Sequence, residues 1–506
     1  GRGYLRASAH TPTSTWFYDG HFHHDPCMPG TLMAEAAVQA LEFHAAALGL
    51  TTDRDGYVFE PVPGHTAKFI CRGQVVPDAD HDVIYEVFVD EVVDGDTPEI
   101  YASLLATSDG KKVFYCPRFG IRLRRNWAKR RVAAHPLIIG PLGESRGDEE
   151  TLLECADGAP SAAFGDMYRK FDTESIVARL PQPPYHFLSR VTSVSTRPGT
   201  EESGAVMTAE YDISSDDWYF DDNLNGQMPF AVLAEIALQP CGWLASHSGF
   251  ALPGGLRFRN LEGDGVLHRE VLRTDQRLDT RSTLTNVAKA GPMTLVTFDV
   301  TVDTAAGARV LDLETQFGFF PAAALARQAG LARNAGFAAA YELPAMPAPD
   351  EAHRQALVRG RLRMLDEIDY FDPDGGTSGL GLIRGQQHVD PNAWYFKAHF
   401  YQDPVQPGSL GLDAMTQLLC RMVWLKDIAR GMKRPHISTL ATSAPIRWSY
   451  RGQVTPDRKR VTTAMEIQSI EKRDNDILVT ARGSLWRDGL RVYEVKPMCV
   501  SVRDLG

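Results

Sequence analysis

The sequence has no cysteine pairing pattern, no excess of positive charge and no long apolar run. Its seven cysteines are odd in number, widely scattered and without a CxxC pair, so neither a disulfide framework nor a zinc site is indicated. A formal net charge of -11 disfavours nucleic acid and anionic membranes as main partners, because an acidic field does not attract them. No signal peptide and no uninterrupted apolar segment of about 18 residues is present. We therefore expect a cytoplasmic protein that binds no metal and does not insert into membranes.

The length of the chain exceeds what one hydrophobic core can serve. Its 506 residues are 43% hydrophobic, which suits about three domains of ordinary size. The chain begins GRGYL, without Met, and we expect it to be cut from a longer polypeptide.

One unit is written three times. The segment WFYDGHFHHDPCMPGTLMAEAAVQ, from Trp16, returns as WYFKAHFYQDPVQPGSLGLDAMTQ, from Trp394. Each is followed by a strand-like segment containing RGQV and a Pro two residues later, so the repeat extends well beyond a short motif. A degraded copy, WYFDDNLNGQMPFAVLAEIALQ, begins at Trp218 and lacks the histidine that the outer copies carry.

Each copy has the same predicted architecture. A loop ending in Pro opens a helix with apolar residues at helical spacing, which ends near Gly49, Gly249 or Gly431. Strand-like runs follow, such as residues 82–93, 99–108, 112–124, 294–302 and 311–320. One long helix followed by antiparallel strands predicts an α+β fold with the helix laid on a sheet. The predicted organisation is a first repeat at 1–130, a linker at 131–165, a second repeat at 166–322, a linker at 323–356 and a third repeat at 357–506.

The repeated stretch has the composition of an acid–base site. His21 and His399 each precede a helix carboxylate, Glu35 or Asp413, by 14 residues. A Gln follows the acid four residues later in all three copies, so both project from one helix face: Glu35 and Gln39, Glu235 and Gln239, Asp413 and Gln417. Neutral His suits a base, a buried carboxyl an acid, and N–H groups after Pro-Gly can polarise a carbonyl. Together these suit β-elimination of water from a 3-hydroxyacyl thioester.

Simpler interpretations apply to each residue alone. A histidine in a loop usually serves structural hydrogen bonding, and Asp-Pro and Pro-Gly are ordinary turn signals. His23 and His24 suggest a metal, but the third copy has Tyr401 and Gln402 at these positions. Cys27 aligns with Val405 and indicates packing. Recurrence of His, Pro and acid in register is what favours the functional interpretation.

The segment HFYQDPVQPGSLGLDAMTQ closely resembles the active-site segment of bacterial β-hydroxydecanoyl-acyl carrier protein dehydratases, and GHFHHDPCMPGTLMAEAAVQ resembles it more loosely. Tandem copies with a decayed one between them resemble the dehydratase region of polyunsaturated fatty acid synthases and related iterative polyketide synthases. The resemblance implies tandem hotdog folds, no cofactor beyond the phosphopantetheine that carries the substrate, and a His and carboxylate from different hotdogs of a pair. It implies acyl carrier protein domains and other synthase modules as partners, and homodimerisation is a further possibility. Some members also isomerise the new double bond.

By position, the resemblance assigns roles to two sets of residues. The catalytic set is His21, Glu35, Glu235, His399 and Asp413, and the substrate-binding set is Gly30, Gln39, Gln239, Gly408 and Gln417. Glu35 departs from the family's Asp, and the middle copy keeps only its acid, Glu235. A hotdog thioesterase and a non-catalytic acyl-binding scaffold are the alternatives.

The missing histidine predicts which copies pair. The second copy has a full lead-in and directly precedes the third, so we expect these two to form a double hotdog with a site made of His399 and Glu235, helped by Gln239. Asp413 would then face a site without a base. The alternative pairs the first copy with the second, joining His21 to Glu235. We also expect an apolar tunnel lined by Leu410, Met415 and Leu419.

Overall fold

The computed structural model describes residues 3–22, 24–52, 54, 57–95, 97–125, 147–173, 176–223, 226–332, 340–346 and 360–506. The chain divides into two compact units, residues 1–131 and 132–506. Each is considered by itself.

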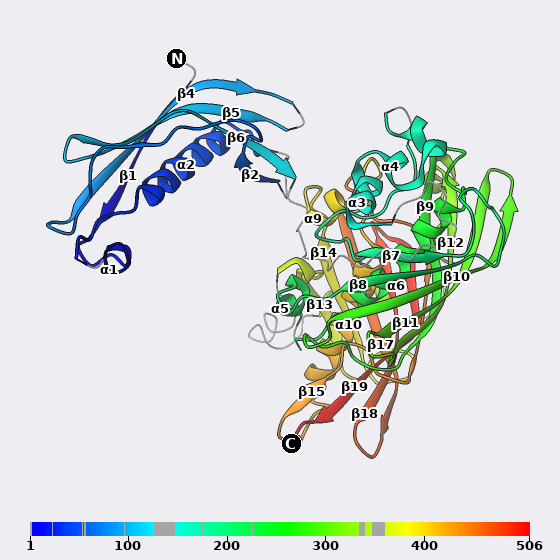
Figure 1. Ribbon diagram of the computed structural model, residues 1–506. Helices are drawn as coiled ribbons and strands as arrows, with labels where there is room; N and C mark the ends of the chain where they lie inside the picture. The colour runs from blue at the N-terminus through cyan, green and yellow to red at the C-terminus, as the bar shows by residue number, and fades with distance from the viewer. Residues whose placement is uncertain are drawn as a thin grey trace. The chain divides into compact units, whose positions relative to one another are not determined.

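The first unit, hotdog 1, is one helix laid on an antiparallel sheet. Helix α2 (Gly30–Ala47) lies along one face of this sheet (Figure 1), and Met33, Ala37 and Leu41 are among the helix residues buried against it. The short helix α1 (Phe17–Gly20) precedes it. The strands run in the order β1-β4-β5-β6-β2, with β3 also on β6. Their bounds are β1 Tyr4–Thr11, β2 Tyr57–Pro61, β3 Ile70–Cys71, β4 His81–Val93, β5 Glu99–Ser108 and β6 Lys111–Arg125.

The strands of hotdog 1 follow the alternation read from the sequence. The segments predicted at 82–93, 99–108 and 112–124 lie within β4, β5 and β6. In β5 every second side chain is buried, as expected for a sheet with one face on a helix.

The second unit contains two such arrangements in one 13-stranded sheet. Helices α6 (Phe230–His247) and α10 (Gly408–Leu425) occupy the position of α2, and α5 (Trp218–Asp222) and α9 (Trp394–Ala398) that of α1. The strand order is β13-β14-β17-β18-β19-β16-β9-β12-β11-β10-β8-β7, with β15 on β19. The bounds are β7 Arg190–Val194, β8 Val206–Asp212, β9 Leu256–Leu267, β10 Arg277–Ala290, β11 Met293–Thr304, β12 Arg309–Pro321, β13 Glu367–Asp372, β14 Leu382–His388, β15 Pro435–Ile437, β16 Pro445–Tyr450, β17 Arg460–Lys472, β18 Ile477–Arg487 and β19 Leu490–Asp504.

The strand order reads equivalently from both ends, so the unit is a double hotdog. Hotdog 2 comprises β7–β12 with α6, and hotdog 3 comprises β13–β19 with α10. They join where β16 pairs with β9, and α6 also contacts α10. Trp218 and Trp394, equivalent residues of the two hotdogs, meet edge to face with ring centroids 5.7 Å apart. The prediction that the second and third copies pair is confirmed, and the alternative pairing of the first with the second is wrong for this unit.

Part of the predicted linker at 131–165 belongs to the core. Residues 131–146 lie outside the described ranges, but α3 (Glu149–Asp157) and α4 (Pro160–Phe164) are ordered helices. Their side chains Leu152, Cys155 and Phe164 are fully buried in the same core as hotdogs 2 and 3. The linker interpretation is therefore wrong for these helices, because their apolar residues are spaced to face a core.

The predicted linker at 323–356 is also partly packed. Helix α7 (Ala322–Ala326) follows β12, and Ala340 and Tyr341 pack with Trp486 of β18. Residues 333–339 and 347–359 lie outside the described part.

The long helices end as predicted in two of the three copies. Gly49 and Gly249 follow α2 and α6 with φ of +87° and +95°, the left-handed conformation that glycine adopts without steric cost. The prediction of Gly431 is wrong: α10 ends at Leu425 and Asp427 adopts φ +53° in that role, since Ile428 N–H bonds back to the Val423 carbonyl.

Candidate active site at the junction of two hotdogs

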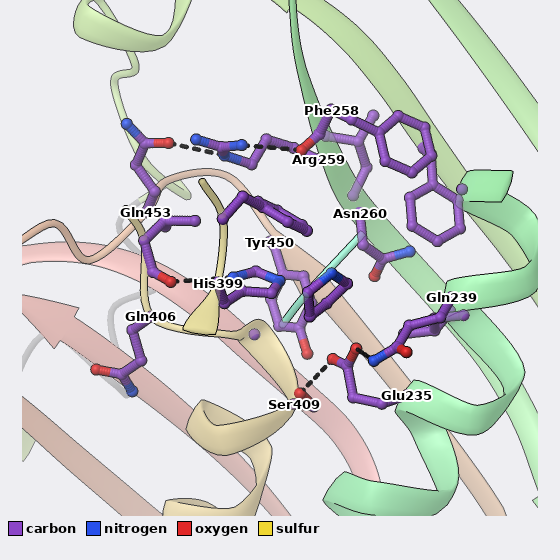
Figure 2. A pocket seen from close by; sticks show the side chains of 18 of the residues that line it. Glu235, Gln239, Phe258, Arg259, Asn260, His399, Gln406, Ser409, Tyr450 and Gln453 are labelled. Atoms are coloured by element: carbon purple, nitrogen blue, oxygen red, sulfur yellow. Dashed lines mark hydrogen bonds between the residues drawn. The ribbon is translucent and has the colours of Figure 1, made fainter. Parts of the chain in front are cut away.

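A pocket lies where hotdogs 2 and 3 meet. Its walls come from α6, β9 and β12 of hotdog 2 and from the loop before α10, β16 and β19 of hotdog 3. Figure 2 shows His399 and Glu235 reaching it from opposite hotdogs. The principal polar lining residues are Arg179, Glu235, Gln239, Arg259, Asn260, His399, Gln406, Ser409, Tyr450, Gln453 and Tyr493.

His399 ends helix α9 and is held as a neutral imidazole. Its Nδ1 donates to the Val405 carbonyl, 3.0 Å away, which leaves Nε2 as the unprotonated nitrogen. Burial lowers the pKa of His399 to about 3; the Val405 bond opposes this shift, whereas the charge of Arg259 adds to it. His399 is only 9% exposed, so the expectation of a loop histidine with little core packing is wrong.

Glu235 projects from α6 and is held as a buried acid. Ser409 Oγ donates to its Oε1 at 2.6 Å and Gln239 Nε2 donates to its Oε2 at 3.1 Å. Burial raises the pKa of Glu235, and the bonds from Ser409 and Gln239 act against that rise. A carboxyl in this environment keeps its proton to higher pH than an exposed one.

Gln239 is fixed by the backbone that leads into hotdog 2. Its Oε1 accepts from Phe187 N–H at 2.8 Å and its Nε2 donates to the Tyr185 carbonyl at 2.9 Å. Both ends of the amide are therefore committed, and Gln239 presents a fixed donor to Glu235.

The start of α10 lies against an aromatic ring. Gly408 lines the pocket, and a Cβ there would lie 2.6 Å from the Tyr450 ring, so only glycine fits. The first N–H groups of a helix have no intrahelical partner. Those of α10 are thus suited to polarise an oxygen in the pocket.

The Asp of the Asp-Pro pair has a role that sequence reasoning missed. Asp403 receives two bonds from the Arg259 guanidinium, at 2.7 and 2.8 Å, and pairs with Arg257 at 2.8 Å. The histidine loop of hotdog 3 is thereby tied to β9 of hotdog 2. Ser409 and Tyr185 were also missed; the only signal was a hydroxyl after Pro-Gly in the outer copies.

Asp413 is not among the pocket residues. It accepts from Gln417 Nε2, which also donates to the Leu362 carbonyl, and burial raises the pKa of Asp413 to about 7. The residue equivalent to His399 on this side is Asn223, which ends α5 and donates from Nδ2 to the Gln227 carbonyl at 2.9 Å. Asn223 therefore reproduces the loop bond of the histidine Nδ1 but offers no basic nitrogen.

Two more substitutions accompany Asn223 in hotdog 2. Phe230 replaces the glycine found at Gly30 and Gly408, and Ala231 replaces the hydroxyl residue found at Thr31 and Ser409. Both are buried. The second junction side thus has an acid without the other parts of the site.

In hotdog 1 the predicted residues are more open. His21 Nδ1 bonds to the Cys27 carbonyl at 2.9 Å, as in hotdog 3, and Gln39 Nε2 donates to Glu35 at 3.0 Å. Glu35 and Gln39 are exposed on α2, whereas their counterparts on α6 and α10 are buried. Gly30 starts α2, as Gly408 starts α10.

Two further expectations concern the pocket and metals. Leu410, Met415 and Leu419 are completely buried in the core and do not line the pocket, so the tunnel prediction was wrong in its residues. The apolar lining comes instead from Leu180, Leu238, Phe258, Leu261 and Phe317. Within the described ranges, no three His, Cys, Asp or Glu side chains gather as metal ligands would.

All seven cysteines are free. None of the described helices is long and apolar enough to cross a membrane.

The fold and this junction define a double-hotdog protein with a His from one hotdog and a carboxyl from the other. The FabA-like domain model matches residues 1–116 and 357–496, just over half of the chain. The chain belongs to the FabA-like family. Hotdog 2 lies between the two matched regions.

Relatives of known name cover the chain in different ways. A polyunsaturated fatty acid synthase polypeptide of Thraustochytrium sp. is 26% identical over 643 aligned residues, covering 96% of this chain and 42% of that protein. The chain thus spans less than half the length of this relative. The dehydratase domain from the CurJ module of curacin polyketide synthase has 12% identity over 62% of this chain and 96% of its own, with a TM-score of 0.38. The solved structure of GphF dehydratase 1 has 14% identity over 61% and 100%, with a TM-score of 0.38.

Proposed function

We propose that this chain is a hydro-lyase that removes water from 3-hydroxyacyl thioesters carried on acyl carrier protein during polyunsaturated fatty acid or polyketide synthesis. The observation that carries the proposal is the convergence of His399 and Glu235, a neutral base and a buried acid, on one pocket between two hotdogs. Membership of the FabA-like family and the synthase relative support it.

The proposed step divides the work between the hotdogs. His399 Nε2 takes a proton from C2 of the acyl chain while the first N–H groups of α10 polarise the thioester carbonyl. Glu235 gives its proton to the 3-hydroxyl, which leaves as water as the C2–C3 double bond forms. Transfer of the proton from His399 back to Glu235, directly or through water, restores both groups.

The proposal has consequences for partners. The substrate is delivered on the phosphopantetheine arm of an acyl carrier protein, in the cytoplasm, alongside the other modules of a synthase. Base, acid and carbonyl donors all come from the chain, so we expect no requirement for an added metal or nucleotide.

The test is incubation with a 3-hydroxyacyl carrier protein, followed by mass spectrometry of the acyl group. Loss of one water supports the proposal, and chromatography against 2-enoyl and isomerised standards identifies the product. Release of free thiol without loss of water would instead identify a thioesterase, and an unchanged acyl group would identify a binding scaffold.

The pH dependence of kcat/KM should be bell-shaped with displaced limbs. His399 must be neutral, and its lowered pKa places the acid limb well below the usual range of histidine. Glu235 must be protonated, and its raised pKa places the alkaline limb above the usual range of glutamate. Rates measured across pH with enzyme of verified fold check both directions; a limb near pH 6.5 from His399 would contradict the assignment.

We also propose that hotdog 1 completes its own site by pairing with hotdog 1 of a second copy of the chain. In the double hotdog, the equivalents of Glu35, Gln39 and Phe43 are buried against the partner hotdog, yet Phe43 is 66% exposed. Trp16, Phe22 and Phe69 are likewise more than half exposed. Pairing about a twofold axis would give each His21 a Glu35 from the other copy.

Phe43→Asp should therefore convert a dimer to a monomer, because it places a charge in an apolar interface. Sedimentation of the full chain measures this, with Val92→Asp, a 40% exposed residue at the end of β4, as the matched control. A wild-type chain that stays monomeric at high concentration would contradict the pairing.

A further inference from the structure

The carboxyl of Glu235 belongs to a closed hydrogen-bond ring across the hotdog junction. Ser409, the second residue of α10, donates to Glu235 Oε1, and Tyr185 OH lies 2.9 Å from the same Ser409 Oγ. Since the Ser409 proton is directed at the carboxylate, the Tyr185 hydroxyl is the donor to Ser409. The ring closes through Gln239, which donates both to Glu235 and to the Tyr185 carbonyl.

The members of this ring are buried. Tyr185 is completely buried, Ser409 is 3% exposed and Gln239 is 4% exposed. Bonds to a carboxylate in such an environment are stronger than in water. The ring therefore fixes where the Glu235 carboxyl points, as Figure 2 shows for Ser409, Glu235 and Gln239.

The chain contains its own comparison. Where a hotdog carries the histidine, its long helix begins with a hydroxyl residue after glycine, Thr31 or Ser409; hotdog 2, without the histidine, has Ala231. Asp413 keeps its Gln417 bond, but the backbone that anchors Gln417 belongs to Leu362, which has no hydroxyl. The amide is retained on both sides, whereas the hydroxyls are found only beside the histidine. Ala231 also shows that a helix start without the hydroxyl folds.

We propose that Ser409, supported by Tyr185, is a positioning residue that aims the Glu235 carboxyl into the pocket and assists its release of the proton. The inference rests on the proposed function for its catalytic meaning. Both donors to the carboxyl gain strength as Glu235 loses its proton to the leaving hydroxyl. Other titratable groups around Glu235 are His399 from the loop before α10, Tyr450 from β16 and Asp413 from α10.

Ser409→Ala should lower kcat by about 10-fold to 100-fold, the usual value of a hydrogen bond to a charged group. It should also move the alkaline limb of the pH profile upward, because loss of a donor to the carboxylate raises the pKa of the acid. Ser409→Thr should restore both, and Tyr185→Phe should move the limb in the same direction by less. Thr416→Val is the matched control: its buried hydroxyl lies on the same helix but donates to the Leu412 carbonyl, and the limb should stay in place.

A second measurement does not depend on turnover. The infrared band of the protonated Glu235 carboxyl, identified by its loss in Glu235→Gln, should titrate at higher pH in Ser409→Ala than in the wild type. An unmoved band and limb, or an equal shift in Thr416→Val, would overturn the positioning role. If the wild type removes no water, the proposed function fails, while the infrared titration still decides the role of Ser409.

Discussion

His399→Asn, in a chain that also carries His21→Asn, is expected to lower the rate of water loss by about 10²-fold to 10⁴-fold, the usual contribution of a general base. Asparagine is chosen because Asn223 already makes the corresponding loop bond in hotdog 2. The variant keeps the donor to the Val405 carbonyl and removes only the basic nitrogen. The measurement is single-turnover mass spectrometry on a 3-hydroxyacyl carrier protein.

The comparison requires the His21→Asn chain as its reference, so that hotdog 1 cannot contribute. Circular dichroism and thermal unfolding verify the fold, since His399 is buried and its loss could loosen the junction. Full turnover by the doubly substituted chain would rule out His399 as the base.

Glu235→Gln should produce a loss of similar size, because glutamine preserves shape but cannot give a proton to the leaving hydroxyl. The matched control is Asp413→Asn, which alters a carboxyl that is also buried and followed by a Gln but lies outside the pocket. Its rate should change little. Both variants are assayed in the His21→Asn background with the same substrate.

The reverse pattern would be decisive. If Asp413→Asn stops water loss while Glu235→Gln does not, the acid of the reaction comes from the same hotdog as His399. The assignment of work across the β16–β9 junction would then be wrong.

Much of the architecture could be predicted from the sequence because it is written three times. Alternating burial in β5 and the common Pro–helix–strand order are local features that a single copy already reveals. The Ala, Pro and Gly content around α3 and α4 resembles that of a connection and so predicts a linker, whereas burial of these helices depends on a core assembled from distant residues. Gly431 is a plausible helix end by residue type, although Asp427 also tolerates the left-handed conformation.

The site was predictable to the extent that it resides in a motif. The pairing argument selected His399 and Glu235, which are separated by 164 residues in the sequence, because only one of the two candidate acids lies opposite a histidine. Arg259, Tyr185 and Ser409 could not be assigned in this way. Their roles depend on contacts between hotdogs, and no spacing within one copy reveals a bond such as Arg259 to Asp403.

Fusion of two hotdogs into one polypeptide changes how the junction can diversify. In an assembly of identical protomers, any substitution appears at both symmetry-related positions, so loss of a base at one is loss at both. Here Asn223 and Phe230 occupy one side while His399 and Gly408 occupy the other. One side could therefore be closed and filled with apolar packing that strengthens the shared sheet, while the other keeps a narrow, polar opening. Separate inheritance of the two halves lets mechanical and chemical duties be optimised independently.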